Sequence, residues 1–218
     1  MNVTFRLART EADKAHVLRL RQAVYVGDQG RLADAGDTAA TFDRFDPYAE
    51  YIVGYDGGRP VGTVKVVPDT AVGLPCDDSV DLAGLRRGNR LVEFGHLMTL
   101  PDVRHREIGM ALMREAVIHS ARKHDVTHIL GDFFVDDSEG LRGFYKEIGF
   151  AALHEPYEDI RFKGSPLSLV AALDVADAVS RARTPEGKKS RLLRYFFGDY
   201  DSYKRGEAAD ADTAAVPR

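Results

Sequence analysis

Glu93 lies within LVEFGHL (residues 91–97), a run that is otherwise apolar enough to form a central β-strand. Charged side chains are rarely fully buried, and burial would raise the pKa of this carboxyl into the range that a general base needs. The alternative is a carboxylate at a strand end that forms an ion pair with Arg90, Lys65 or His96. We therefore interpret Glu93 as a candidate base and leave that alternative open.

Two arginines follow where this apolar segment ends. The segment Leu91–Leu100 stops at Pro101, and a helical pattern begins at Ile108, with Arg104 and Arg106 in the turn between them. The exposed N–H groups and the positive end of the helix dipole make such a junction an anion site. The pattern predicts a phosphate-bearing ligand, the alternative being two solvated surface arginines.

Two other groups of residues do not support a reactive site. His119, His124 and His128 are spaced by five and four residues across a predicted helix end, so the three imidazoles would not share one face. Cys76 follows Pro75 in a loop, and no residue pattern gives it a paired base. We expect no metal and no cysteine nucleophile.

The composition limits the class of protein. A chain of 218 residues with 44% hydrophobic and 29% charged residues is typical of one large globular domain with extensions. The net charge of −4 does not support a nucleic-acid partner, and the single cysteine fits a reducing compartment. No segment is long and apolar enough to span a bilayer, and residues 1–14 lack the apolar part of a signal peptide. We expect a cytoplasmic protein.

Periodicity and turn residues predict an α/β order. Strands are predicted at residues 3–7, 50–55, 60–67, 91–100, 127–135, 150–153 and 165–174, and helices at 10–26, 106–123, 136–147 and 175–183. A hairpin signal lies at residues 56–58, and the polar stretch 27–48 has the length of a functional loop. This order predicts a mixed sheet with helices on both faces.

We divide the chain into three parts. Residues 1–175 form the main domain, residues 176–205 form a C-terminal helical extension, and residues 206–218 form a low-complexity tail that we expect to be disordered.

Two segments together resemble the GNAT acyltransferase superfamily. LMTLPDVRHREIG (residues 97–109) is similar to its strand, pyrophosphate loop and helix, and GFYKEIGF (residues 143–150) is similar to its late helix, tyrosine and turn. The resemblance implies a GNAT-like mixed sheet, mostly antiparallel, with helices on both faces.

The loop departs from the superfamily's pattern, Arg/Gln-x-x-Gly-x-Gly/Ala. Counting from Arg104 puts Glu107 in the place of the first glycine, where a carboxylate beside a pyrophosphate is unfavourable. Counting from Arg106 puts Gly109 at the first glycine of the pattern and Ala111 at its last position, and it makes the turn before the helix longer. Either the second register holds, or the donor is not held as coenzyme A usually is.

Five ordered motifs narrow the resemblance to the branch that contains the acyl-homoserine lactone synthases and the N-acyl amino acid synthases. They are RQAVY (21–25), DRFD (43–46), GTVK (62–65), LP (74–75) and EFGH (93–96). The branch typically transfers long acyl chains from acyl carrier protein to an amine derived from an amino acid. Lys65 and His96 stand where it has arginines, which disfavours the lactone route.

The resemblance implies a role for each candidate residue. Glu93 would take a proton from the ammonium, Tyr145 would protonate or hydrogen-bond to the leaving thiolate, and the backbone from Met98 to Leu100 would contact the oxyanion and pantetheine. The phosphates would be held by Arg104, Arg106, Gly109 and Ala111. The acceptor would be held by Arg21, Asp43, Asp46, Lys65 and His96. The alternatives are ordinary loop charges and, for Tyr145, packing beside Phe144.

We therefore predict an N-acyltransferase in which the amine attacks a thioester directly. The preferred donor is a fatty acyl group on acyl carrier protein, followed by acyl-coenzyme A, and the acceptor is an amino acid or a related small amine. An acidic carrier protein would need a basic docking surface. Its candidates are Arg86, Arg87, Arg90, Arg104, Arg106 and residues 188–197. The alternatives are an acetyl-coenzyme A-dependent acetyltransferase, favoured by the intact segment 145–150, and a non-catalytic acyl-thioester-binding module, favoured by Glu107.

Overall fold

The structure is a computed structural model that describes residues 3–135 and 139–206. The strands are β1 (Val3–Leu7), β2 (Glu50–Asp56), β3 (Arg59–Pro68), β4 (Leu91–Thr99), β5 (His128–Phe134), β6 (Ala151–Ala152), β7 (Tyr157–Glu158) and β8 (Leu167–Asp174). The helices are α1 (Glu11–Arg21), α2 (Ala35–Ala40), α3 (Ala83–Arg86), α4 (Ile108–His124), α5 (Glu139–Ile148), α6 (Val175–Arg183), α7 (Arg191–Phe197) and α8 (Tyr200–Arg205). The predicted caps at 136–138 and the predicted tail, beyond its first residue, lie outside the described residues.

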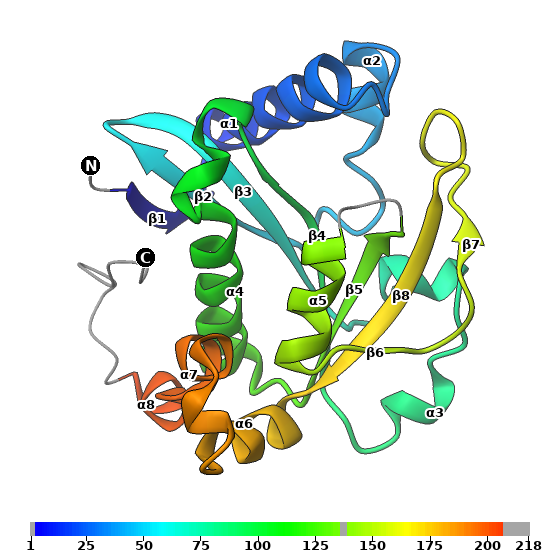
Figure 1. The fold of residues 1–218 in the computed structure, drawn as a ribbon. Coiled ribbons are helices and arrows are strands. Elements are labelled where there is room, and N and C mark those ends of the chain that lie inside the picture. The colour runs from blue at the N-terminus through cyan, green and yellow to red at the C-terminus, as the bar shows by residue number, and fades with distance from the viewer. Residues whose placement is uncertain (1–2, 136–138, 207–218) are drawn as a thin grey trace.

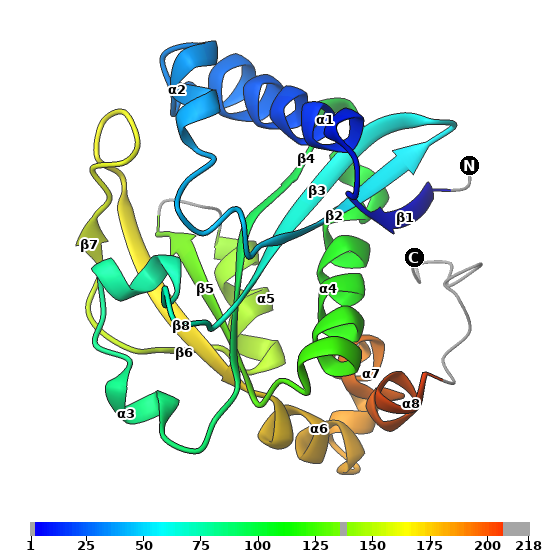
Figure 2. The same ribbon diagram turned by 180° about the vertical axis from the view of Figure 1, so that it is seen from behind.

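The strands form one mixed sheet in the order β1-β2-β3-β4-β5-β8-β6, with β7 also beside β8. All the recorded pairs are antiparallel except β4 with β5. Figures 1 and 2 show α4 and α5 packed along the sheet, with α1 and α2 across its upper end. The predicted mixed, mostly antiparallel sheet is confirmed.

Strand alternation separates the two helical layers. On β2, Ile52 belongs to the core cluster that contains α4, whereas Tyr51 and Val53 belong to the cluster that contains α1. The two helices therefore cover opposite faces of the sheet.

The first helix begins as predicted but ends differently. Thr10 Oγ1 accepts from the backbone of Asp13, whose carboxylate accepts from the backbone of Thr10, which completes the capping box. The α-helix ends at Arg21 and continues as a π-helical segment, Gln22–Asp28, that buries Val24 and Tyr25. Such wide turns often occur at functional sites.

β4 and β5 are paired over only part of their length. The parallel pairing joins Leu91–Phe94 to His128–Gly131 and stops there. On the other edge, the pairing with β3 shifts register so that His96 and Leu97 oppose Val64 alone. His96 lies at φ 48°, in the left-handed region. This bulge redirects β4 where it leaves β5 and opens the sheet.

The helix predicted at residues 106–123 begins later than expected. Residues Pro101–Arg106 form a 3₁₀ helix, Glu107 lies at φ 57°, and α4 begins at Ile108. Because Glu107 is in the left-handed conformation, the 3₁₀ helix does not continue into α4. The hydrophobic periodicity of the sequence does not predict such an interruption. The predicted strand at 150–153 shrinks to β6, and the two-residue strand β7 was missed.

The C-terminal extension packs into the main core, with α6, α7 and α8 gathered at the lower end of α4 in both views (Figures 1 and 2). Leu193, Phe196, Phe197, Tyr200 and Tyr203 join the same buried cluster as α4. Arg114 of α4 donates to the Tyr195 carbonyl at 3.0 Å and to the Tyr203 hydroxyl at 3.0 Å. Among the described residues, no helix has the length and apolar character that a membrane crossing requires.

We expect Phe196→Ala to lower the free energy of unfolding by about 3–5 kcal/mol, because the ring is fully buried and packs edge-to-face against Phe144. Urea unfolding of the full chain measures this change. Arg194→Ala, an exposed position on the same helix, should change it by less than about 0.5 kcal/mol. Equal stability of the two variants would contradict the packing of α7 into the core.

Candidate active site

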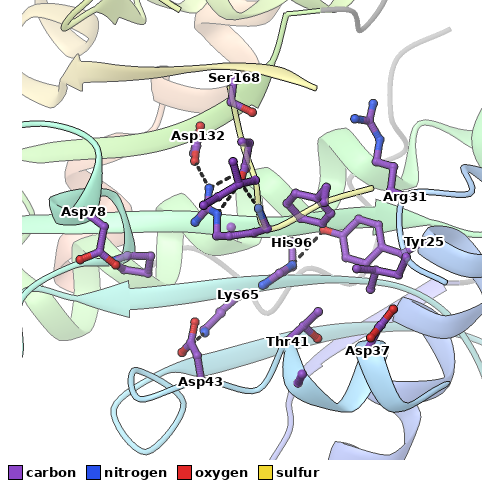
Figure 3. A pocket seen from close by; sticks show the side chains of 18 of the residues that line it. Tyr25, Arg31, Asp37, Thr41, Asp43, Lys65, Asp78, His96, Asp132 and Ser168 are labelled. Atoms are coloured by element: carbon purple, nitrogen blue, oxygen red, sulfur yellow. Dashed lines mark hydrogen bonds and ion pairs between the residues drawn. The ribbon is translucent and has the colours of Figure 1, made fainter. Parts of the chain in front are cut away.

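One cavity of about 730 Å³ opens on the face of the sheet that carries α1 (Figure 3). Its floor is formed by β3, β4, β5 and β8, and its walls by the connection between α1 and β2 and by the loop between β7 and β8. The volume lies in the range of small-molecule sites. The polar stretch 27–48, predicted to be functional, supplies one wall from Arg31 to Phe45.

The floor places four polar side chains on one face. Val67 pairs with Glu93, Lys65 with Gly95, and Glu93 with Leu130, two residues before Asp132. Phe134 pairs with Ser168 on β8. Because alternate residues share a face, Lys65, Glu93, Asp132 and Ser168 all point into the cavity.

Glu93 is buried, with 4% of its surface exposed. Its Oε2 accepts from the Cys76 backbone N–H at 2.9 Å. Burial, helped by the nearby charge of Asp132, raises the pKa of Glu93 to about 7 despite hydrogen bonds from Cys76. A carboxyl with this pKa takes up and releases protons near neutral pH.

The alternative ion pairs for Glu93 do not form. Arg90 binds Asp125 at 2.7 Å, and His96 Nδ1 lies 2.8 Å from the Tyr25 hydroxyl. Burial lowers the pKa of His96 well below its ordinary value, so its imidazole is neutral.

Cys76 is buried beside Glu93. Burial first, and then the Glu93 charge, raises the pKa of its thiol. The thiol therefore stays protonated, which disfavours a nucleophilic role.

Lys65 forms ion pairs with both aspartates predicted to hold the acceptor. Its Nζ lies 3.2 Å from Asp43 and 3.1 Å from Asp46, and its side chain is 2% exposed. Asp43 lines the cavity, but Asp46 lies behind it and also accepts from the Tyr51 hydroxyl. The Lys65 ammonium is buried, whereas the Asp43 side chain is 39% exposed, so the ion cluster lies at the edge of the cavity. Figure 3 shows Lys65 and Asp43 side by side.

Arg21 supports the wall and does not line the cavity. It donates to Thr41 at 2.8 Å and to Tyr51 at 2.7 Å, and its guanidinium lies 4.3 Å from the centre of the Phe42 ring. Its side chain is fully buried.

Sequence reasoning missed a second acidic group at the cavity. Asp132 Oδ2 accepts from Arg161 at 2.6 Å and from the Tyr157 hydroxyl, and Arg161 also binds Asp159 at 2.7 Å. Asp132 Oδ1 is buried and has no hydrogen-bond partner among the described residues. Asp132 interrupts the apolar segment 129–134 as Glu93 interrupts 91–97, so the same signal could have found it.

Tyr145 lies on the opposite face of the sheet. Its ring centroid is 4.0 Å from that of Phe133 and 5.7 Å from that of Phe150, and it does not line the cavity. Phe133 follows Asp132 on β5 and so points to the other face. Tyr145 and Glu93 can therefore act on the same reacting atoms only if these atoms lie in the opening between β4 and β5.

The backbone beside this opening is tightly packed against β3. The Leu100 N–H donates to the Val61 carbonyl at 2.9 Å, and Met98 pairs with Thr63. A Cβ on Gly62 would lie 2.7 Å from the Met98 carbonyl oxygen, so this approach requires glycine. Since main-chain groups alternate between strand edges, those of Thr99 face the opening.

The predicted phosphate ligands surround the beginning of α4. Arg104 and Arg106 are exposed and form ion pairs with Asp28 and Asp56. Gly109 and Ala111 lie in the first turn of the helix. Glu107 occupies the N-cap position of α4 but its side chain makes no capping hydrogen bond, and its Oε1 lies 3.4 Å from Arg191 of α7.

A family model described as N-acyl amino acid synthase FeeM matches residues 16–172. The structure of FeeM, an N-acyl amino acid synthase from uncultured soil microbes, aligns with a TM-score of 0.69 at 19% identity, covering 87% of this chain and 98% of that chain. A putative N-acetyltransferase from Lactobacillus plantarum aligns with a TM-score of 0.57 at 21% identity, covering 80% and 99%. Arabidopsis thaliana NAA60, solved with acetyl-CoA, aligns with a TM-score of 0.56 at 15% identity, covering 80% and 99%. At these identities the structures share the fold; the comparison with curated proteins finds no match.

The raised pKa of Glu93 predicts how stability depends on pH. The unfolded chain releases the Glu93 proton near its ordinary pKa of 4.5, whereas the folded chain keeps it until about pH 7. The neutral carboxyl therefore stabilises the fold at low pH, and this contribution is lost as the pH rises from 4.5 through 7. Relative to Glu93→Gln, the wild type should lose about 3 kcal/mol over this interval.

Urea unfolding of both chains between pH 5 and 8 measures this difference. Parallel pH profiles for the two chains would show that Glu93 ionises at its ordinary pKa.

Proposed function

The chain belongs to the family of the N-acyl amino acid synthase FeeM and is a GNAT-type N-acyltransferase, and we propose that it transfers a fatty acyl group from a thioester to the amine of an amino acid. The observation that carries this proposal is Glu93, a buried carboxyl with a pKa of about 7 on the floor of a cavity large enough for an acceptor. It supplies a base where an ammonium must lose a proton before it can attack.

The reaction needs no covalent enzyme intermediate. Glu93 takes a proton from the acceptor's ammonium, and the neutral amine attacks the thioester carbonyl carbon. The new C–N bond forms, the C–S bond breaks, and the sulfur leaves as a thiolate that takes a proton. Tyr145, on the other side of the opening, is the proposed donor of a hydrogen bond or proton to that sulfur.

Asp132 and Glu93 together suit an ammonium group. Asp132 Oδ1 is a buried acceptor without a hydrogen-bond partner among the described residues, and the charge of Asp132 acts on Glu93. An acceptor ammonium would supply the missing donor to Asp132 and lie next to the base. The acceptor's carboxylate would meet Arg161, whose side chain is half exposed at the same cavity.

The cavity also has apolar walls for an acyl chain. These side chains are contributed by Leu32, Phe45, Val67, Phe134, Ile160 and Phe162. Phe162 packs against Tyr25 and Phe134, at ring-centroid distances of 5.4 and 5.1 Å, and closes the cavity on the side of the β7–β8 loop.

The beginning of α4 favours a donor without a diphosphate. Glu107 places a carboxylate at this end of the helix, where a diphosphate would otherwise benefit from the dipole. Arg191, 3.4 Å away, offsets only part of this charge, because both side chains are partly exposed. A phosphopantetheine arm on acyl carrier protein carries a single phosphodiester, so it loses less from this carboxylate than coenzyme A does. Acyl carrier protein is therefore the favoured donor.

Carrier docking would use arginines that already have acidic partners. Arg86 binds Asp69 and Asp77, and Arg104 binds Asp28. An acidic carrier protein would compete with these carboxylates, which predicts salt-sensitive association.

Acetyl-coenzyme A is the second candidate donor. The shared fold with NAA60, which was solved with acetyl-CoA, favours it. The apolar cavity walls favour a longer chain.

The proposal is tested by incubating the protein with the twenty amino acids and one donor at a time, followed by mass spectrometry of the products. The donors are acyl carrier protein carrying a long acyl chain, the matched acyl-coenzyme A, and acetyl-coenzyme A. We expect acylated amino acid, most rapidly with the carrier protein, and a kcat/KM that rises with pH to a plateau above about pH 7. Product from acetyl-coenzyme A alone would replace the fatty acyl proposal with the second candidate.

Glu93→Gln should lower kcat by about 10²- to 10⁴-fold and remove the rise with pH, because glutamine accepts no proton. Circular dichroism and urea unfolding serve as controls for folding. Retention of wild-type kcat and pH dependence by a folded variant would exclude Glu93 as the base.

Asp132→Asn should raise the KM for the amino acid by about 10- to 100-fold and leave the KM for the donor unchanged, because a charged hydrogen bond to the ammonium is lost. Tyr157→Phe is the matched control, since it removes one donor to Asp132 and keeps the carboxylate. If both variants behave alike, Asp132 acts through the loop and does not bind the acceptor.

A further inference from the structure

Two histidines and one glutamate converge at the end of α4. His119 Nε2 lies 2.8 Å from Glu50 Oε2, and His124 Nε2 lies 2.7 Å from the same oxygen. The ligand atoms of the three residues all lie within 4.8 Å of one another. Lys123 Nζ contacts the other carboxylate oxygen of Glu50.

This cluster is separate from the active-site cavity. Glu50 is the first residue of β2 and pairs with Val66, which faces α4, whereas the next residue, Tyr51, faces α1. Glu50 therefore points to the face of the sheet opposite Glu93. As the sequence spacing predicts, the three histidines do not converge, since His128 lies near Asp174. The carboxylate that joins His119 and His124 comes from a distant strand, which the spacing could not predict.

The three side chains are prepared to bind a cation. They are 16–17% exposed, so the cluster is sheltered but leaves room for water. Glu50 is the shared partner of the cluster, because one of its carboxylate oxygens faces both imidazoles and the other contacts Lys123.

We propose that Glu50, His119 and His124 bind Zn²⁺ or a similar first-row divalent metal, with water as the fourth ligand. Two imidazoles and one carboxylate are a known zinc ligand set, and imidazole favours zinc over magnesium or calcium. Lys123 holds the carboxylate oxygen that does not bind the metal, which orients the ligand as outer partners do in metal sites. Without a metal, both imidazoles share one oxygen of Glu50 as their hydrogen-bond acceptor. A bound metal would instead accept one ligand atom from each of the three side chains.

The expected role of this metal is structural. It ties the beginning of β2 to the last two turns of α4, and these two elements are far apart in sequence. Tyr51, next to Glu50, hydrogen-bonds to Asp46 and Arg21. The link between β2 and α4 would therefore also stabilise the wall of the cavity.

The test uses the full chain after treatment with a chelator and dialysis. Zn²⁺ is titrated against a chromophoric competitor, and the Tm is recorded over the same range. We expect one Zn²⁺ per chain and a rise in Tm of about 5–10 °C when free Zn²⁺ reaches about 100 times its Kd. Co²⁺ in place of Zn²⁺ should give the intense visible absorption of a four-coordinate site.

His119→Gln and His124→Gln separate a metal site from a hydrogen-bonded cluster. Glutamine can still donate to Glu50 but is a poor zinc ligand, so each variant should weaken Zn²⁺ binding by more than about 10-fold and lose the Tm shift. His128→Gln is the matched control and should retain both. Absence of stoichiometric binding in the wild type, or equal Kd values in all four chains, would overturn the proposal, and the second result would identify an adventitious surface ion. These readouts do not depend on acyl transfer.

Discussion

β4 and β5 are hydrogen-bonded only from Leu91 to Phe94 on one strand and from His128 to Gly131 on the other. Beyond these residues the strands separate, because the bulge at His96 and Leu97 turns β4 toward β3. A fully paired sheet would put a continuous wall between the cavity and the side of α4 and α5. The incomplete pairing instead leaves an opening between the two faces, which the proposed reaction of a thioester on one face with an amine on the other requires.

The charges around the cavity fall into two groups. Lys65 with its aspartates and Arg161 with Asp132 and Asp159 are ion pairs that offset the cost of burial. Glu93 accepts hydrogen bonds from Cys76 and forms no ion pair within the described part of the chain, and the charge of Arg161 lowers its pKa by less than burial raises it. This difference separates the residues that shape the cavity from the residue that can exchange a proton.

The C-terminal helices cover part of the region around the beginning of α4, the proposed donor site. α7 brings Arg191 to Glu107 and Phe196 to Phe144, so it spans α4 and α5. The carboxylate that looked anomalous in the loop therefore has a cationic partner. At the other end of α4, Glu50 and the two histidines link the helix to β2 in a similar way.

The sequence by itself determined most of the elements, since caps, hairpins and strand alternation depend on residues within a few positions of one another. The capping box at Thr10, the hairpin between β2 and β3, and the burial of Glu93 all follow from such local rules. The structure separates the residues predicted to hold the acceptor into two groups. Asp43, Lys65 and His96 line the cavity, whereas Arg21 and Asp46 lie behind its wall.

Only the tertiary structure decided which side chains meet. Asp132 reaches Arg161 across the end of the sheet, and Glu50 reaches His119 from 69 positions away. Such partners are fixed by strand register and helix packing, for which a single sequence carries no local signal.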